Sequence, residues 1–88
     1  MASYQVRIRR RAEKDLRKLP PTTARRVWAK IRSLQREPSP SASEKLAGST
    51  HAYRLRVGAY RILYEVDHES ESVDVFRVAH RREAYRKR

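Results

Sequence analysis

One stretch decides the fold, and it reads Tyr53-Arg54-Leu55-Arg56-Val57-Gly58-Ala59-Tyr60-Arg61-Ile62-Leu63-Tyr64. Apolar and basic residues alternate along its first half with a period of two, which is typical of a half-buried strand. A glycine at the first of two central positions favours a type II′ turn, so Gly58-Ala59 predicts a tight hairpin. We therefore interpret the stretch as two antiparallel strands.

This hairpin gathers arginines on one face. With a two-residue loop, Arg56 lies opposite Arg61, and Arg54 lies diagonal to Arg61 on the same face. Like charges placed directly opposite one another on a sheet repel, so stability alone does not favour the arrangement. An anion among the guanidinium groups would offset the repulsion, and phosphate fits the planar arginine fork. The simpler alternative is a solvated basic face whose charges are screened by salt.

The composition points to an anionic partner. The 88 residues include 22 Lys and Arg against 10 Asp and Glu, a net charge of +12. This excess favours nucleic acid first, an acidic protein second and an anionic membrane third. There is no cysteine for a disulfide or a thiolate zinc site. With no apolar signal region and no run approaching the roughly 20 residues that span a bilayer, we expect a cytoplasmic protein without membrane attachment.

The rest of the chain predicts one domain over residues 1–88 of class α+β. The order is strand, helix, helix, strand, strand, strand, with a helical pair on one face of a mainly antiparallel four-stranded sheet. Segment 44–48 fits either a helical turn or extended chain, and the tail from residue 80 predicts a short helical turn. The expected bounds are 3–9 for the first strand, 10–19 and 21–37 for the helices, 53–66 for the hairpin and 72–79 for the last strand.

The helical pair should cover the apolar face and leave the arginine face open. Trp28 lies on the apolar stripe of the second helix, so we expect it to be buried in the core. On the open face, Leu63, Phe76 and Val78 are expected to form an apolar floor beside the arginines, where a protein partner could dock.

Arginines alone could stabilise the charge that develops on a phosphate during RNA cleavage, without a metal ion or other cofactor. In such a reaction the ribose 2′-hydroxyl attacks the adjacent phosphate and leaves a 2′,3′-cyclic phosphate and a 5′-hydroxyl. Arginine stays protonated, so other groups must move the protons. The candidates are His80, Tyr85, His51 and Glu83. Each also has a purely structural alternative; Tyr85, for instance, could pin the tail to the sheet.

The chain resembles the toxins of the RelE/ParE superfamily of type II toxin–antitoxin systems. The resemblance rests on the hairpin stretch, on Leu16-Arg17-Lys18-Leu19-Pro20, on Lys45-Leu46-Ala47-Gly48 and on Val78-Ala79-His80-Arg81-Arg82-Glu83-Ala84-Tyr85. Members of the RelE branch cleave mRNA in the ribosomal A site, on a basic concave sheet face without metal. The resemblance thus implies an mRNA endoribonuclease that inhibits translation, with a RelB-like antitoxin, the ribosome and mRNA as partners. We expect that antitoxin to be acidic and to fold on binding.

Matching the family's motif residue by residue implies a catalytic set. It consists of Arg54, Arg56, Arg61, Arg81 and Tyr85, with His80 in support, and Arg77 and Arg82 join the first three arginines as RNA-binding residues. The chain departs from the best-known branch, which carries lysines where this sequence has Arg54 and Arg56. A lysine's role as general base therefore does not transfer.

Two alternatives remain open. Relatives of the ParE branch share the fold but inhibit DNA gyrase by binding to it. A basic RNA-binding module without chemistry would also fit the charge of this chain.

Overall fold

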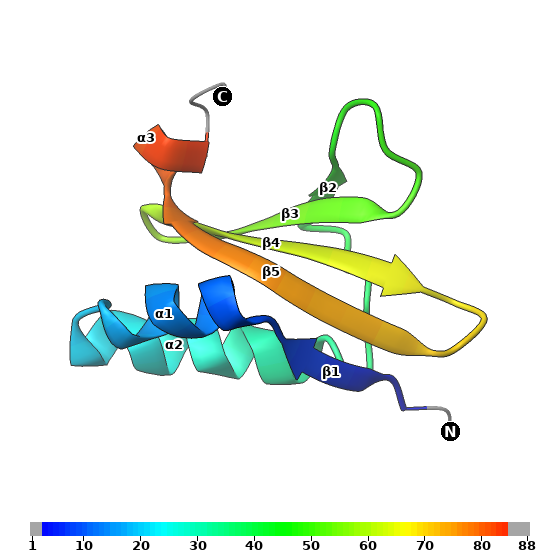
Figure 1. The fold of residues 1–88 in the computed structure, drawn as a ribbon, viewed down its shortest axis with the longest axis horizontal. Coiled ribbons are helices and arrows are strands. Elements are labelled where there is room, and N and C mark those ends of the chain that lie inside the picture. Colours follow the sequence, from blue (N-terminus) through cyan, green and yellow to red (C-terminus); the bar gives the residue numbers. More distant parts are fainter. Residues whose placement is uncertain (1–2, 85–88) are drawn as a thin grey trace.

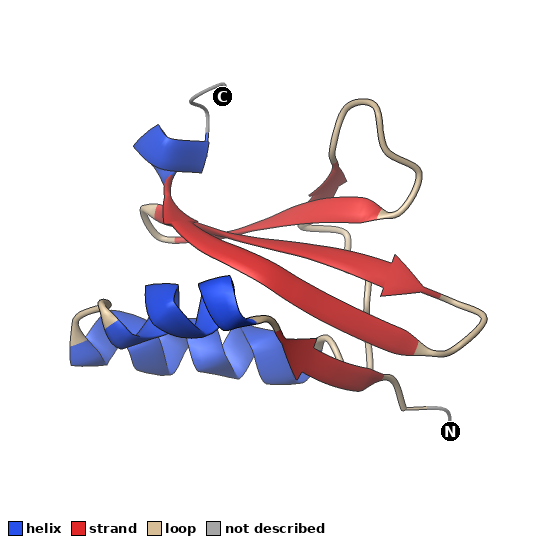
Figure 2. Cartoon of the chain, viewed as in Figure 1, coloured by secondary structure: helices blue, strands red, loops and turns tan. Residues whose placement is uncertain are grey.

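The computed structural model describes residues 3–84, which form two layers (Figure 1). Two helices lie side by side beneath one face of a five-stranded sheet, and the other face is free of helices except for the short α3 at its end (Figure 2). The predicted α+β architecture is therefore confirmed. The elements are β1 (Gln5–Ile8), α1 (Arg10–Arg17), α2 (Pro21–Ser33), β2 (Ser43–Lys45), β3 (Ala52–Val57), β4 (Tyr60–Asp67), β5 (Ser72–His80) and α3 (Arg81–Ala84).

The sheet is mixed and has one strand more than expected. Its order is β1-β5-β4-β3-β2, with β1 parallel to β5 and the other neighbours antiparallel. The fifth strand is β2, which includes residues 44 and 45 of the segment that the sequence left between helix and extended chain, whereas residues 46–48 form neither helix nor strand. Because β2 pairs with β3 over three residues only, its signal was too short to stand out from the surrounding loop.

The hairpin of β3 and β4 has the predicted register. Val57 pairs with Tyr60, and Arg56 pairs with Arg61. Gly58 has φ +59°, whereas Ala59 is outside the positive-φ region, as a type II′ turn requires. A Cβ at Gly58 would meet only side-chain atoms of Arg26 at 3.5 Å and beyond, so the backbone angle, rather than space, demands glycine here.

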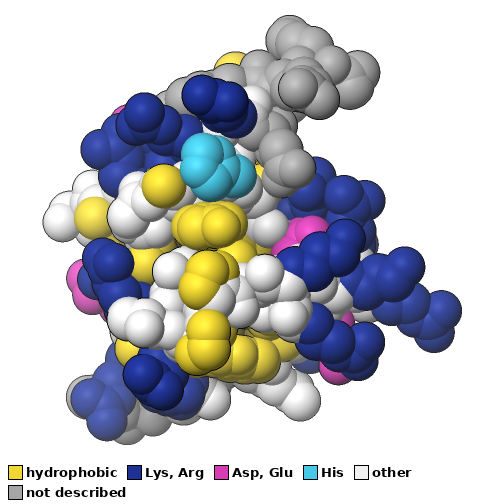
Figure 3. Space-filling view, turned by 90° about the vertical axis from the view of Figure 1, so that its left-hand side faces the viewer, with side chains coloured by type: hydrophobic (Ala, Val, Ile, Leu, Met, Phe, Trp, Pro, Cys, Tyr) yellow, Lys and Arg dark blue, Asp and Glu magenta, His cyan; other side chains and the backbone are white. Residues whose placement is uncertain are grey.

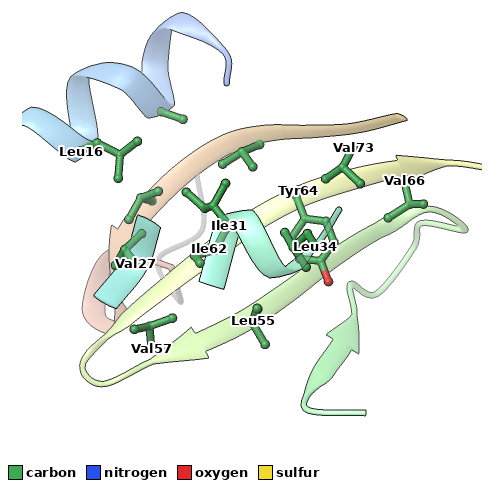
Figure 4. Close-up of a cluster of buried hydrophobic side chains, with 13 residues drawn as sticks. Leu16, Val27, Ile31, Leu34, Leu55, Val57, Ile62, Tyr64, Val66 and Val73 are labelled. Carbon is green, nitrogen blue, oxygen red and sulfur yellow. The ribbon is translucent and has the colours of Figure 1, made fainter. Parts of the chain in front are cut away.

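The core lies between the two helices and the underside of the sheet (Figure 4). Val27, Ile31 and Leu34 follow one another at helical spacing and point from α2 towards the sheet. On the sheet they pack against every second residue of β3 and β4, and these core-facing residues carry no charge. The strand side chains of this layer are Leu55, Val57, Ile62, Tyr64, Val66, Val73, Val75 and Val78.

Trp28 is not part of this core, so the prediction that it is buried is wrong. Its exposed fraction is 38%. Successive residues of a helix are 100° apart, and Val27 already occupies the centre of the buried stripe together with Ile31. Trp28 is therefore rotated to the border of the stripe, where one side of the indole meets solvent.

A β-bulge interrupts β5 at Phe76. Leu63 pairs with Arg77, but the next residue, Tyr64, pairs with Val75, so β5 carries one extra residue at this point. The extra residue changes the alternation of faces along β5. Val78 is consequently buried opposite Ile62, and its expected place on the open face is wrong, whereas Leu63 and Phe76 remain half-buried outside the core cluster.

We predict that Ile31→Ala lowers the free energy of unfolding by about 2 to 5 kcal/mol, because it leaves a cavity under the sheet. Trp28→Ala should lower it by about 1 kcal/mol or less, since the indole is at the border of the core. Urea unfolding followed by far-UV circular dichroism measures both, and it does not depend on the single tryptophan. A loss for Trp28→Ala as large as that for Ile31→Ala would contradict this description of the core.

Candidate functional site

Three arginines line a hollow on the face of the sheet opposite the helices. Arg54 and Arg56 come from β3, and Arg61 comes from β4. Ala42 and Glu44 complete the lining, and the volume is about 420 Å³. We call this site the arginine hollow. The hairpin register brings the three arginines together, as the sequence predicted.

The three arginines differ in burial. Arg61 is 3% exposed although its strand position faces away from the core, Arg54 is half-buried and Arg56 is exposed. One Arg61 Nη donates to the carbonyl oxygen of Tyr60 at 3.4 Å. Arg61 is thus a buried cation, and it is less accessible than the open face of a hairpin suggested.

Glu44 belongs to the site, and sequence reasoning missed it. It pairs with Arg54 across β2 and β3, and its Oε1 accepts a hydrogen bond from Arg54 Nη2 at 2.6 Å. This bond lowers the pKa of the Glu44 carboxyl below its usual value, and the positive charges of Arg56 and Arg61 lower it further. Its acidic side chain in a segment that could pair with β3 was the sequence feature that could have indicated a partner for the arginines.

His80 lies on the other face of the sheet. It pairs with Tyr60, which itself pairs with the buried Val57, and cross-strand partners share a face. The rings of His80 and Tyr60 are in edge-to-face contact, with centroids 5.3 Å apart. Together with Leu19 and other residues of the α1 segment they line a second hollow of about 230 Å³. The structure therefore does not bring His80 to the arginine hollow.

Arg77 also turns to the helical side. Its Nε donates to Oδ2 of Asp15 in α1 at 2.9 Å, and the backbone N–H of Val78 donates to the same oxygen at 2.9 Å. The Asp15 side chain is only 10% exposed, so this is a largely buried ion pair. Arg77 does not line the arginine hollow and serves to attach β5 to α1.

The end of β5 comes back to the hairpin. The backbone N–H of Arg81 donates to the carbonyl oxygen of Ala59 at 2.7 Å, which ties the start of α3 to the tight turn. Figure 1 shows α3 rising on the side of the sheet that carries the arginine hollow. Arg81 and Arg82 are exposed there. Tyr85 and the side chain of Glu83 lie outside the described part of the structure.

His51 is remote from the cluster, because it precedes β3 at the end opposite the turn. Its Nδ1 is 2.8 Å from Oγ1 of Thr50. It borders a third hollow, of about 420 Å³, whose lining includes the carboxylates of Glu65, Asp67, Glu69 and Asp74. The two ends of the sheet thus differ in charge: arginines gather near the turn and carboxylates at the far end.

Basic side chains also spread beyond the hollow. Figure 3 views the end of the molecule that bears the β3–β4 turn and the α1–α2 connection, where lysines and arginines flank a central strip of hydrophobic side chains. None of the helices within residues 3–84 has the length and apolarity that crossing a lipid bilayer requires. Within the same residues, no group of three or more His, Cys, Asp and Glu side chains could hold a metal ion.

Known proteins resemble this chain along nearly its whole length. The family described as ParE toxin of type II toxin-antitoxin system, parDE, matches residues 6–85. Toxin RelG of Mycobacterium tuberculosis is 40% identical over 88 residues, covering 96% of this chain and 98% of that protein. The putative toxin RelE1 of Methanocaldococcus jannaschii is 30% identical over 86 residues, with 94% and 96% covered.

Solved structures agree with the sequence relatives. A chain of the toxin–antitoxin complex RelBE2 from Mycobacterium tuberculosis superposes with a TM-score of 0.80 at 35% identity, covering 91% of this chain and 93% of that chain. A chain of the archaeal RelE–RelB complex from Pyrococcus horikoshii gives a TM-score of 0.78 at 27% identity, with 90% and 96% covered. Sequence and fold lead to the same assignment: this chain belongs to the RelE/ParE superfamily of toxins of type II toxin–antitoxin systems.

Proposed function

We propose that this toxin is a metal-independent endoribonuclease that cleaves mRNA in the ribosomal A site and so stops translation. The observation that carries the proposal is the convergence of Arg54, Arg56 and Arg61 on one hollow. Its relatives named RelE and RelG favour the RNA-cleaving branch of the superfamily. The reaction is attack of a ribose 2′-hydroxyl on the adjacent phosphate, which forms the 2′,3′-cyclic phosphate and releases the 5′-oxygen.

In this proposal the arginines stabilise the phosphate as its negative charge grows. Arg61 is held in a buried position, so it needs little reorganisation when the transition state forms. Arg56 is exposed and lies directly opposite Arg61, where it can contact the same phosphate from the solvent side. The half-buried Arg54 and the exposed Arg82 would hold the neighbouring phosphates of the RNA.

The C-terminal segment completes the proposed site. The backbone of Arg81 is hydrogen-bonded to Ala59 in the turn between the two strands that carry the arginines, and this supports including Arg81 in the proposed site. Tyr85 follows Arg81 by four residues in the sequence and is our candidate for the proton donor to the leaving 5′-oxygen. His80 contributes indirectly, since its contact with Tyr60 packs the end of β5 against β4.

A RelB-like antitoxin is the proposed partner in the cytoplasm. Toxins of the same fold have been solved in complex with RelB in Mycobacterium tuberculosis and Pyrococcus horikoshii. A net charge of +12 favours an acidic partner, and the half-buried Leu63 and Phe76 offer apolar surface beside the arginines. The antitoxin would therefore both cover this surface and keep RNA away from the hollow.

We predict that Arg61→Lys lowers the cleavage rate on programmed ribosomes by about 100-fold, because lysine keeps the charge but loses the planar fork. Arg56→Ala should also lower the rate without loss of stability, since the side chain is exposed. Primer extension on a defined message measures both rates. Arg61→Lys is a better test than Arg61→Ala, which would leave a cavity at a buried position.

The matched control is Arg32→Ala, which removes the same charge from an exposed position of α2 on the other side of the sheet. It should cleave at close to the wild-type rate. Equal losses in Arg32→Ala and Arg56→Ala would show that overall charge, rather than the arginine hollow, governs the reaction.

Gyrase inhibition is the second candidate, because the matching family is described by the ParE toxin. Purified protein incubated with programmed ribosomes should yield fragments that end in a cyclic phosphate. The same preparation should leave gyrase-driven supercoiling of plasmid DNA unchanged. Inhibition of gyrase with intact messages would assign the chain to the ParE branch. If the protein neither cleaves the message nor inhibits gyrase, the remaining function is an RNA-binding module without chemistry.

We predict that expression of the chain alone stops growth and that coexpression with its RelB-like antitoxin restores it. Association of the two purified proteins should slow as salt is raised, because opposite charges steer their encounter. Stopped-flow fluorescence of Trp28 measures that rate. Normal growth with folded protein present in the cells would remove the toxin function.

A further inference from the structure

We propose that Glu44 is a built-in competitor of the RNA phosphate, occupying the arginine hollow in the free protein and giving way when a phosphodiester enters. The inference rests on the proposed function for the identity of the ligand as RNA. The residue, its partner and the hollow are properties of the structure alone. Glu44 thereby sets how tightly this toxin holds RNA.

The geometry places the carboxylate where a phosphate would bind. Glu44 is the acidic residue that lines the arginine hollow, and its Oε1 accepts a hydrogen bond from Arg54 Nη2 at 2.6 Å. A carboxylate and a phosphate use the same acceptor geometry towards a guanidinium group. Phosphate oxygens that approach this edge of Arg54 must therefore replace the Glu44 oxygen.

The backbone around Glu44 is fixed, whereas its side chain is free to move aside. Ser43 is held by its N–H and its hydroxyl, which both donate to the carbonyl oxygen of Pro40, and the N–H of Leu46 donates to Ala52. The Ser43 bonds fix the loop before β2, and the Leu46 bond together with the pairing of residues 43–45 holds β2 against β3. The side chain itself is 69% exposed, so it can turn into solvent without disturbing the sheet.

An exposed ion pair of this kind is easily displaced. Its attraction is weakened by water, and the side chain regains rotamer freedom when it leaves. The competitor therefore reduces RNA affinity without abolishing it. Removal of its charge should tighten binding about fivefold, the effect of one unit charge acting over a few ångström through water.

The same face offers a matched control. Glu65 points from β4 to the same side of the sheet and pairs with Arg9 Nη2 at 3.5 Å, but it does not line the arginine hollow. Glu65→Gln changes the net charge by the same amount as Glu44→Gln. Any difference in RNA affinity between the two variants is then due to the position of the removed charge, because their net charges are the same.

The first experiment measures binding without cleavage. The probe is a 2′-O-methyl RNA trinucleotide, whose blocked 2′-oxygen cannot attack, titrated into the 88-residue chain by isothermal calorimetry at low and moderate salt. We expect Glu44→Gln to bind about fivefold more tightly than wild type and Glu65→Gln to stay within twofold of it. Equal affinities for the wild type and Glu44→Gln, equal gains in both variants, or no binding by any of the proteins would each overturn the inference.

The second experiment separates a competitor from a proton acceptor. On programmed ribosomes, Glu44→Gln should lower KM and leave kcat unchanged, because the carboxylate leaves the hollow before chemistry. A fall in kcat of about 100-fold or more would instead make Glu44 the group that accepts the 2′-hydroxyl proton, and would overturn the competitor role. If no protein cleaves RNA while the binding difference persists, the proposed function fails and this inference stands.

Discussion

The pairing of Arg56 with Arg61 is the constraint on which the site depends. The type II′ turn at Gly58-Ala59 leaves no freedom in the register, so two guanidinium groups are forced to the same spot of one sheet face. Arg54 precedes Arg56 by two residues and therefore lies on the same face, and Glu44 lies opposite Arg54 on the neighbouring strand. The fold thus concentrates positive charge at a defined place and supplies one carboxylate to balance part of it.

The sequence predicted what depends on local pattern. The alternation of residues 53–57 and the glycine of the turn were sufficient to derive the register and the three arginines of the hollow. The place of His80 and Val78 could not be derived in this way, because the bulge at Leu63 and Tyr64 shifts the faces of β5 and no local pattern marks it. Trp28 was misplaced since helical periodicity does not separate the centre of a stripe from its border. The burial of Arg61 and the presence of Glu44 depend on contacts between distant segments, which a single sequence does not reveal.

Asp15 supplies a hydrogen-bond acceptor at the part of the β5 edge that β1 does not cover. β1 pairs only with residues 72–75 of β5, so the second half of β5 would otherwise present unpaired backbone groups at its edge. The Asp15 carboxylate accepts the N–H of Val78 and the Nε of Arg77, and thereby joins α1 to that edge. This contact adds to the pairing of β5 with β4, which runs as far as His80, and so helps to position the start of α3. A residue on the helical side of the sheet therefore contributes to the position of Arg81 on the other side.

The charge distribution links stability to binding. Carboxylates on β4 and β5 pair with Arg7 and Arg9 at the far end of the sheet, so the positive potential near the turn is not cancelled within the fold. The repulsion between Arg56 and Arg61 is a cost that the free protein carries, which Glu44 reduces only in part because its ion pair is exposed. An anion bound in the hollow removes this cost and gains the hydrogen bonds of the guanidinium groups at once. RNA and an acidic antitoxin segment would both stabilise the native state in this way, since any ligand that binds only the folded chain shifts the folding equilibrium towards it. In the proposed function, the arginines that would bind RNA would also be the groups on which an acidic inhibitor acts.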